Sequence, residues 1–359
     1  MSILPDAETF RRLTDGSMRG PGAATLRVAL ALLAVPYGVA TATRNTLYDR
    51  GLLRQHTAPI PVISVGNLTL GGTGKTPLVA WVARLLVASG HRPAVVSRGY
   101  AAQPGEVSDE AAELAILVPG VTHMADRDRV HGATTAAARG ADVAILDDGF
   151  QHRRLRRGLD LVAVDASDPF GCGHLFPRGL LRESPAGLAR AHAVVLTRAG
   201  SLTADQRGAI RDAVTRARRG RPPACWLETT HRPVATRTAG GQVEPLEAIA
   251  GRRAAAVCGI GNPAAFRDTL KSCGLDLAGF RAFADHHAYS PTDCDAIAAW
   301  AQALGVERIV TTLKDLVKIR RDELGGIPLV AVEVAIEPLG DPQPLADAIT
   351  AAARSGGRE

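Results

Sequence analysis

Short apolar runs recur along the chain, and polar residues or glycine follow most of them directly. They have the length of buried strands and lie at Pro93–Ser97, Val143–Leu146, Leu159–Val164, Ala193–Leu196, Ala254–Cys258 and Arg308–Thr312. Helical periodicity appears between them, as in Leu78–Ser89 and Ala264–Ser272. Short continuous apolar strands that alternate with helices predict a mostly parallel α/β sheet covered on both faces. In such a sheet ligands bind beyond the carboxyl ends of the strands, so the polar residues there are candidates for a functional site.

Residues 61–77, PVISVGNLTLGGTGKTP, predict a buried strand, a glycine-rich turn and the start of a helix. Glycines let the backbone N–H groups point inward around a phosphate chain, and the helix N-terminus adds a favourable dipole. Lys75 would place positive charge on the β- and γ-phosphates, and the Thr76 hydroxyl would bind Mg²⁺. We therefore expect a nucleoside triphosphate site formed by Thr69, Gly71, Gly72, Thr73, Gly74, Lys75 and Thr76.

One position departs from the common phosphate-loop pattern. G-x-x-x-x-G-K-[ST] begins with glycine, where this chain has Thr69. The alternative is a glycine-rich turn that only joins a strand to a helix. The chain has just four lysines, at positions 75, 271, 314 and 318, so a lysine within this turn favours nucleotide binding.

Charged residues follow two other expected strands. Asp147 and Asp148 stand where nucleotide-binding folds place a carboxylate for Mg²⁺. Residues 149–157, GFQHRRLRR, carry four arginines, which suits either a solvated basic loop or a site for a phosphorylated substrate. Arg98, after another strand, could also face a phosphate. Both interpretations of the basic run stay open.

A second α/β series begins near Arg253, and it contains one adjacent histidine pair. Asp285-His286-His287 offers a carboxylate beside an imidazole, which suits a general base better than a metal site, because no third ligand is near. A structural histidine is the alternative. The turn Gly259–Pro263 contains G-x-G without a third glycine and gives only weak evidence for a dinucleotide site.

Composition narrows the class of protein. With 359 residues and 46% hydrophobic residues, the chain can form two globular domains. The net charge of +6 comes without a basic tail, and only 4% of residues are aromatic, so we expect no nucleic-acid partner. The five cysteines are scattered, which favours a reducing compartment and no disulfide framework.

The N-terminal region contains an uncharged, largely apolar segment, Val28–Thr43. As a helix its sixteen residues would span about 24 Å, short of the roughly 30 Å of a bilayer core, and Pro36 and Gly38 weaken it. It could be a buried helix, a signal peptide, or a helix lying in a membrane surface. The last is favoured by flanking arginines, at positions 11, 12, 19, 27, 44, 50 and 54.

Together these segments resemble the tetraacyldisaccharide 4'-kinases of Gram-negative bacteria over nearly the whole chain. The blocks that carry the resemblance are residues 44–51, 65–77, 97–100, 146–152, 181–183, 259–263 and 285–287. The family has threonine in place of the first glycine of the phosphate-loop pattern, as this chain does at Thr69. Two positions depart from the family pattern: Ser108-Asp109-Glu110-Ala111 stands for G-D-E-P, and Thr312-Leu313-Lys314-Asp315 stands for T-E-K-D.

The resemblance implies an ATP- and Mg²⁺-dependent lipid kinase that phosphorylates the 4'-hydroxyl of the lipid A disaccharide precursor. Lys75, Asp109 and His286 would be catalytic, with His287 as an alternative partner for Asp109. Magnesium ligands would come from Thr76, Asp147, Asp148 and Glu183, and substrate contacts from Asn67, Arg98 and Arg182. We expect the chain at the cytoplasmic face of the inner membrane, with no obligate protein partner.

We expect a phosphate-loop α/β fold in three parts. Residues 1–50 form the membrane-associated segment, residues 51–228 the kinase domain, and residues 229–359 a smaller α/β domain that contributes His286 when the two close. The stretches 218–223 and 229–244 mark the junction. A regulatory NTPase of the partitioning type is an alternative, but Leu70 stands where its extra lysine would be. A kinase for a soluble small molecule is a further alternative, and the apolar N-terminal segment counts against it.

Overall fold

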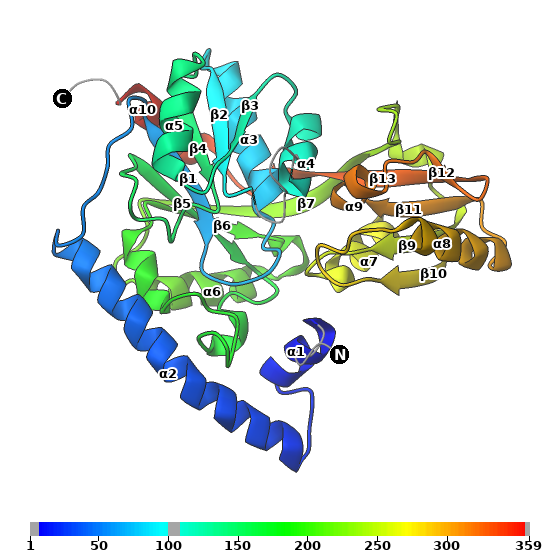
Figure 1. Cartoon of the computed structure of the whole chain (residues 1–359), viewed down its shortest axis with the longest axis horizontal. Helices are drawn as coiled ribbons and strands as arrows, with labels where there is room; N and C mark the ends of the chain where they lie inside the picture. The colour runs from blue at the N-terminus through cyan, green and yellow to red at the C-terminus, as the bar shows by residue number, and fades with distance from the viewer. Residues whose placement is uncertain (1–6, 100–107, 356–359) are drawn as a thin grey trace. The chain divides into compact units, whose positions relative to one another are not determined.

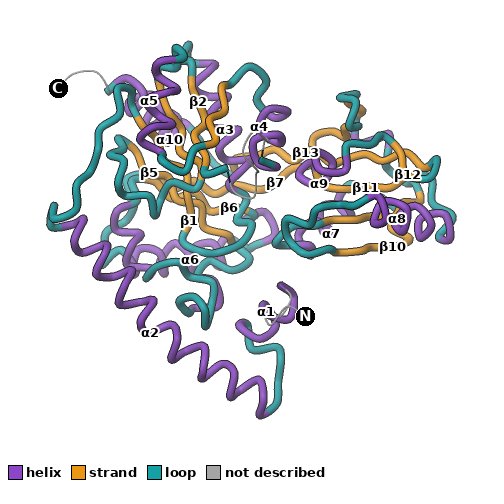
Figure 2. The backbone as a smooth tube through the Cα atoms, in the orientation of Figure 1, coloured by secondary structure: helices purple, strands orange, loops and turns teal. Residues whose placement is uncertain are grey.

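The computed structural model describes residues 7–99 and 108–355, and the chain forms two compact units. One comprises Thr9–Thr230 together with Ile336–Glu359, and the other consists mainly of His231–Ala335. Figures 1 and 2 show the elements of each. The chain passes from one unit to the other within two long strands, β7 Cys225–Arg237 and β13 Ile327–Pro338.

The larger unit contains a parallel sheet with the strand order β7-β6-β5-β1-β4-β2-β3. Its strands are β1 Val62–Asn67, β2 Pro93–Ser97, β3 Thr122–Ala125, β4 Val143–Asp147, β5 Leu159–Asp165, β6 Ala193–Thr197 and β7 Cys225–Arg237. Every residue of β1, β2, β4, β5 and β6 is buried, which confirms the predicted parallel sheet covered on both faces.

Seven helices belong wholly or largely to this unit in the described part of the chain. They are α1 Ala7–Thr14, α2 Pro21–Asp49, α3 Lys75–Ala88, α4 Asp109–Leu117, α5 Arg129–Ala138, α6 Ala204–Ala217 and α10 Gln343–Arg354. Side chains cap several of them: Ser108 begins α4, Asp128 begins α5, and Thr203 forms a capping box with Gln206. Residues 100–107, between β2 and α4, lie outside the described residues.

The smaller unit contains a second parallel sheet, with the order β10-β9-β11-β13. Two short strands pair antiparallel, β12 with β13 and β8 with β7. The elements are β8 Val243–Glu244, β9 Arg253–Cys258, α7 Pro263–Ser272, β10 Asp276–Ala282, α8 Pro291–Ala303, β11 Arg308–Thr312, α9 Leu313–Ile319, β12 Glu323–Leu324 and β13 Ile327–Pro338. Its core includes the fully buried Ala256, Leu270 and Val310.

The division into units differs from the predicted domains at the C-terminus. We expected residues 229–359 to form one domain, but α10 contacts α3 and β1 of the larger unit. The reason is the apolar face of α10, where Leu345 and Ile349 are buried. The expected junction 229–244 contains the end of β7, and the units divide between Thr230 and His231, inside that strand.

Helix α2, the long blue helix in Figure 1, extends beyond the segment predicted from the sequence. Its 29 residues span about 44 Å and continue through Pro36. In the described residues it is the one helix long and apolar enough to cross a membrane, which is a weak sign of membrane association. Val28, Leu32 and Val35 are 62–69% exposed. The interpretation as a plain buried helix is therefore wrong.

Candidate active site

The glycine-rich segment forms the predicted strand, loop and helix. Strand β1 ends at Asn67, and α3 begins at Lys75. Gly71 and Gly74 have φ of 102° and 76°, values in the left-handed region that favour glycine. Thr197 secures the far side of the loop, because its Oγ1 donates to the Thr73 carbonyl oxygen over 2.9 Å. This bond holds the end of the loop that leads into α3.

Asn67 holds this loop from within. Its Nδ2 donates to the Thr69 carbonyl oxygen over 2.8 Å and to Thr73 Oγ1 over 2.9 Å, and its Oδ1 accepts from Lys75 Nζ over 3.2 Å. The side chain is fully buried. We predicted Asn67 as a substrate contact, but its amide is committed to the loop and to the lysine. Its role as a substrate contact stays a prediction.

The two aspartates after β4 have different surroundings. Asp148 has φ 54°, and its carboxylate meets Lys75 Nζ at 3.4 Å and Arg182 Nη1 at 2.6 Å. Burial alone would raise the pKa of Asp148, but Lys75 and Arg182 outweigh it and lower that pKa to about 2. For Asp147, burial and then Glu110 raise the pKa to about 7, against the opposing effect of Lys75.

Sequence reasoning missed two charged neighbours of these aspartates. Arg129, at the start of α5, is buried, and its charge acts on Asp147 and Asp148. Burial lowers the pKa of Arg129, and the two carboxylates oppose that shift. Glu110 is the second residue of α4. The sequence offered little signal for either, because both come from other segments of the chain.

Thr76, Asp147 and Asp148 carry oxygen donors of the kind that Mg²⁺ takes, one hydroxyl and two carboxylates. The described residues contain no group of three or more His, Cys, Asp or Glu side chains arranged to hold a metal. Mg²⁺ does not need one, since it commonly takes one or two carboxylates and completes its shell with phosphate oxygens and water. The raised pKa of Asp147, caused by burial and nearby acids, marks a position where additional positive charge would be stabilising.

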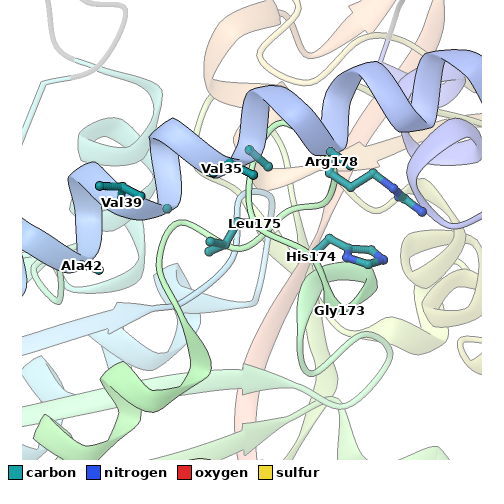
Figure 3. A pocket seen from close by; sticks show the side chains of 10 residues that line it. Val35, Val39, Ala42, Gly173, His174, Leu175 and Arg178 are labelled. Carbon is teal, nitrogen blue, oxygen red and sulfur yellow. The ribbon is translucent and has the colours of Figure 1, made fainter.

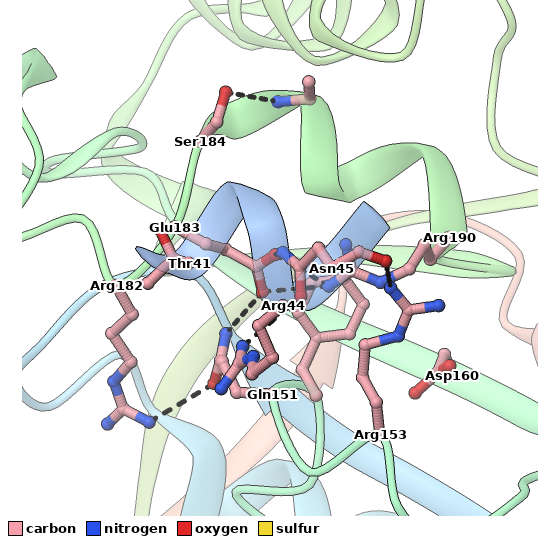
Figure 4. A network of polar contacts seen from close by, with 12 residues as sticks. Thr41, Arg44, Asn45, Gln151, Arg153, Asp160, Arg182, Glu183, Ser184 and Arg190 are labelled. Atoms are coloured by element: carbon pink, nitrogen blue, oxygen red, sulfur yellow. Dashed lines mark hydrogen bonds and ion pairs between the residues drawn. The ribbon is translucent and has the colours of Figure 1, made fainter. Parts of the chain in front are cut away.

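Glu183, the fourth predicted magnesium ligand, has a different environment from the one we expected. It is 1% exposed, and both carboxylate oxygens accept from Arg190 Nη2, at 2.8 and 2.9 Å. Asn45 Nδ2 donates to one oxygen over 2.7 Å, and Gln151 Nε2 approaches the other at 3.1 Å (Figure 4). These contacts satisfy the carboxylate without a metal. We therefore leave Glu183 out of the proposed ligand set.

Most of the basic run after Asp148 is used for structure, which neither sequence interpretation expected. Arg153 is buried and donates to Asp49 Oδ1 over 2.7 Å, while Arg157 donates to both Asp160 carboxylate oxygens over 3.0 Å. Arg154 pairs with Asp128 over 3.1 Å. Arg98, predicted as a substrate contact, follows β2 and is exposed.

The smaller unit distinguishes the two adjacent histidines. His286 has φ 61°, and its Nε2 lies 3.1 Å from Lys314 Nζ, which also pairs with Asp285 Oδ1 at 3.1 Å. His287 Nε2 instead lies 3.2 Å from Asp293 Oδ2 and its ring stacks on Phe283. The two side chains are therefore held by separate partners.

Comparison with known proteins agrees with this geometry. The family model described as tetraacyldisaccharide-1-P 4'-kinase matches residues 26–354. A tetraacyldisaccharide 4'-kinase from Anaeromyxobacter dehalogenans (strain 2CP-C) is 42% identical, with 84% of this chain and 83% of the relative covered. The enzyme of that name from Geobacter metallireducens is 40% identical over 89% of this chain and 96% of its own.

Among solved structures, LpxK from Aquifex aeolicus, described as an "apo" form in complex with ATP, is 29% identical and superposes with a TM-score of 0.70. It covers 91% of this chain and 99% of its own length. The family model spans most of the chain, and the relatives match at about 40% identity. The chain therefore belongs to the tetraacyldisaccharide-1-P 4'-kinase family.

Proposed function

We propose that this chain transfers the γ-phosphate of ATP to the 4'-hydroxyl of a tetraacyldisaccharide 1-phosphate, a step of lipid A biosynthesis that yields lipid IVA. Family membership makes it a kinase, and the relative from Aquifex aeolicus is described in complex with ATP. One observation carries the proposal. Lys75 follows a loop of left-handed glycines at the start of α3, and its ammonium group meets the carboxylate of Asp148.

In this proposal the loop Thr69–Thr76 binds the phosphates of ATP through backbone N–H groups and the Lys75 ammonium. Thr76, Asp147 and Asp148 would hold Mg²⁺, which supplies charge neutralisation at the β- and γ-phosphates when bound. Arg182, drawn toward the loop by Asp148 at 2.6 Å, adds a second cation. Together these groups oppose the negative charge that develops during transfer.

Asp109 is the proposed base, and it opens α4 directly after the capping residue Ser108. It would accept the proton of the 4'-hydroxyl as that oxygen attacks the γ-phosphorus in line, and the bond from the γ-phosphorus to the bridging oxygen of ADP breaks. His286 is its proposed partner. His287 is bound to Asp293 and stacked on Phe283, which supports choosing His286.

The acceptor is amphipathic, and α2 offers a surface suited to it. A groove of about 540 Å³ runs beside α2, lined by Val35, Val39 and Leu175, with His174 and Arg178 toward one end (Figure 3). Apolar walls suit an acyl chain, and a guanidinium suits a phosphate. We propose that the exposed apolar face of α2 lies in the cytoplasmic surface of the inner membrane.

Labelled ATP and the disaccharide 1-phosphate acceptor in detergent micelles test the proposal. The wild-type chain should label the acceptor at the 4'-position. Lys75→Ala should abolish transfer and weaken ATP binding without unfolding the protein, while Lys271→Ala, whose side chain is 66% exposed on α7, should behave as wild type. Near-normal turnover by a folded Lys75→Ala protein would contradict the assigned nucleotide site.

A further inference from the structure

Helix α2 has two faces with different partners. Apolar side chains cover the exposed face, including Leu32 and Leu33 at 69% and 58% exposure. The opposite side makes polar contacts with the body of the larger unit, through Tyr37 and Asn45. Both contacts are made to consecutive residues, Arg182 and Glu183. Two consecutive residues of one loop therefore accept polar contacts from α2.

The first connection from α2 to the phosphate loop passes through side chains. Asn45 Nδ2 donates to Glu183 Oε2 over 2.7 Å, and Gln151 Nε2 contacts Glu183 Oε1 at 3.1 Å (Figure 4). The same Gln151 Nε2 donates to the carbonyl oxygen of Asn67 over 2.8 Å. Asn67 in turn holds Lys75 and the loop threonines. Three successive polar contacts thus link α2 to the residue that organises the phosphate loop.

The second connection passes through the backbone. Tyr37 Oη donates to the Arg182 carbonyl oxygen over 2.8 Å, and the Arg182 N–H donates to the Leu68 carbonyl oxygen over 2.8 Å. One step further along, the Leu70 N–H donates to the Leu180 carbonyl oxygen over 2.7 Å. Residues 180–182 therefore pair with the phosphate loop like a short strand, and α2 binds the same segment.

We propose that Tyr37 and Asn45 are positioning residues for ATP binding, acting on the phosphate loop through Arg182 and Glu183. A consequence follows for the membrane. A lipid surface that binds the exposed face of α2 leaves its polar side on Arg182 and Glu183, so lipid binding holds these contacts and strengthens ATP binding. The inference rests on the proposed function in assigning ATP to the loop and the exposed face of α2 to a lipid surface.

Two minimal variants test the connections. Tyr37→Phe removes one hydroxyl and keeps the ring, which packs on Phe176 at 5.8 Å. Asn45→Ala removes one donor, and Glu183 keeps its bonds from Arg190, so no buried charge is left alone. Thr46→Ala is the matched control, because this exposed hydroxyl donates to the Ala42 carbonyl oxygen and, within the described part of the chain, reaches no segment outside α2.

The first measurement is the Kd for ATP of the purified full chain by equilibrium dialysis, without acceptor. Loss of one hydrogen bond that holds the loop should weaken ATP binding about 3- to 10-fold in Tyr37→Phe and in Asn45→Ala. Thr46→Ala should match wild type. A thermal unfolding midpoint is recorded for each, and the weaker binding should persist in variants whose midpoint is unchanged. Wild-type Kd in both folded variants would overturn the proposal.

The second measurement adds vesicles of phosphatidylglycerol. They should tighten ATP binding by the wild type, and ATP should tighten vesicle binding by the same factor. Tyr37→Phe and Asn45→Ala should still bind vesicles but lose this linkage; full linkage in both variants would overturn the proposal. Failure of the proposed function looks different: the wild type would not bind ATP, or Lys75→Ala would bind it equally well.

Discussion

Replacing Gly66 with alanine tests whether the strand before the phosphate loop must pack closely against the turn that carries Asp147 and Asp148. Gly66 lies near the end of β1, and an added Cβ would sit 2.6 Å from Phe150 Cβ and 2.7 Å from the Phe150 backbone nitrogen. Ordinary carbon contacts are about 3.5–4.0 Å, so a displacement of roughly 1 Å is needed. Phe150 is fully buried, and its backbone rather than a flexible tip must move. Overpacking of this kind costs about 1–3 kcal/mol.

The displacement has a functional consequence, because Phe150 follows the turn that carries Asp147 and Asp148. A shift of this turn would change the 3.4 Å contact between Asp148 and Lys75. A misplacement of about 1 Å in a catalytic site can reduce the rate about 100-fold. We expect Gly66→Ala to fold, to unfold about 2–12 °C below wild type, and to lose about two orders of magnitude in kcat/KM. Acceptor phosphorylation and scanning calorimetry measure these effects.

Gly208→Ala is the control for this substitution. Gly208 lies within α6, and an added Cβ there meets nothing within 4 Å. Alanine in a helix is favoured over glycine by about 0.5–1 kcal/mol, so this variant should be slightly more stable and fully active. If Gly66→Ala behaved in the same way, the close approach of β1 to Phe150 would have no role, and the reasoning would be refuted.

Three further predictions address other parts of the molecule. Asp109→Ala and His286→Ala should each lower kcat about 10²–10⁴-fold and should be strongly non-additive; a double variant whose loss equals the product of the single losses would indicate separate roles. The double variant Leu32→Asp/Val35→Asp changes side chains that are 69% and 62% exposed. It should stay in the supernatant when vesicles are sedimented, and its thermal midpoint should not fall. Burial lowers the pKa of His123 to about 4 from 6.5, so the folded state disfavours the protonated imidazole. The free energy of unfolding should therefore fall by at most about 3 kcal/mol as the pH falls from about 6.5 to 4. His123→Leu should flatten that pH dependence in denaturant titrations.

The strands buried on both faces were the most predictable elements. Pro93–Ser97 and Arg308–Thr312 were predicted with the bounds that β2 and β11 have. Strand β3, Thr122–Ala125, was missed because it is half exposed and contains no continuous apolar run. Helix α2 is longer than the predicted segment Val28–Thr43 because that prediction ended at Arg27 and Arg44, whereas the helix continues through both. Pro36 has no backbone N–H, so the carbonyl oxygen of Leu32 loses its helical donor. Both residues lie on the exposed side of the helix, where that oxygen needs no protein partner.

At the candidate site, the local structure was predictable where one continuous segment forms it. Lys75 and Thr76 follow the glycines directly, so the strand, loop and helix could be derived from one segment. Glu183 shows the limit, since its partners Asn45 and Arg190 lie 138 residues before it and 7 after it. Nothing in the spacing of these residues indicates that the carboxylate is already satisfied. Gln151 could have been flagged, because it stands within the block 146–152 that carries the family resemblance.

The two adjacent aspartates show why residue type alone does not assign a role. The positive φ of Asp148 turns its carboxylate to Lys75 and Arg182, and its pKa of about 2 keeps it ionised across the physiological range. Burial raises the pKa of Asp147 to about 7, with Glu110 adding to the effect. Asp147 therefore gives up its proton less readily than Asp148, although the two residues are adjacent in sequence. Asp148 pairs with two cations of the site, Lys75 and Arg182, and under the proposed function a bound Mg²⁺ would offset the burial of the Asp147 carboxylate.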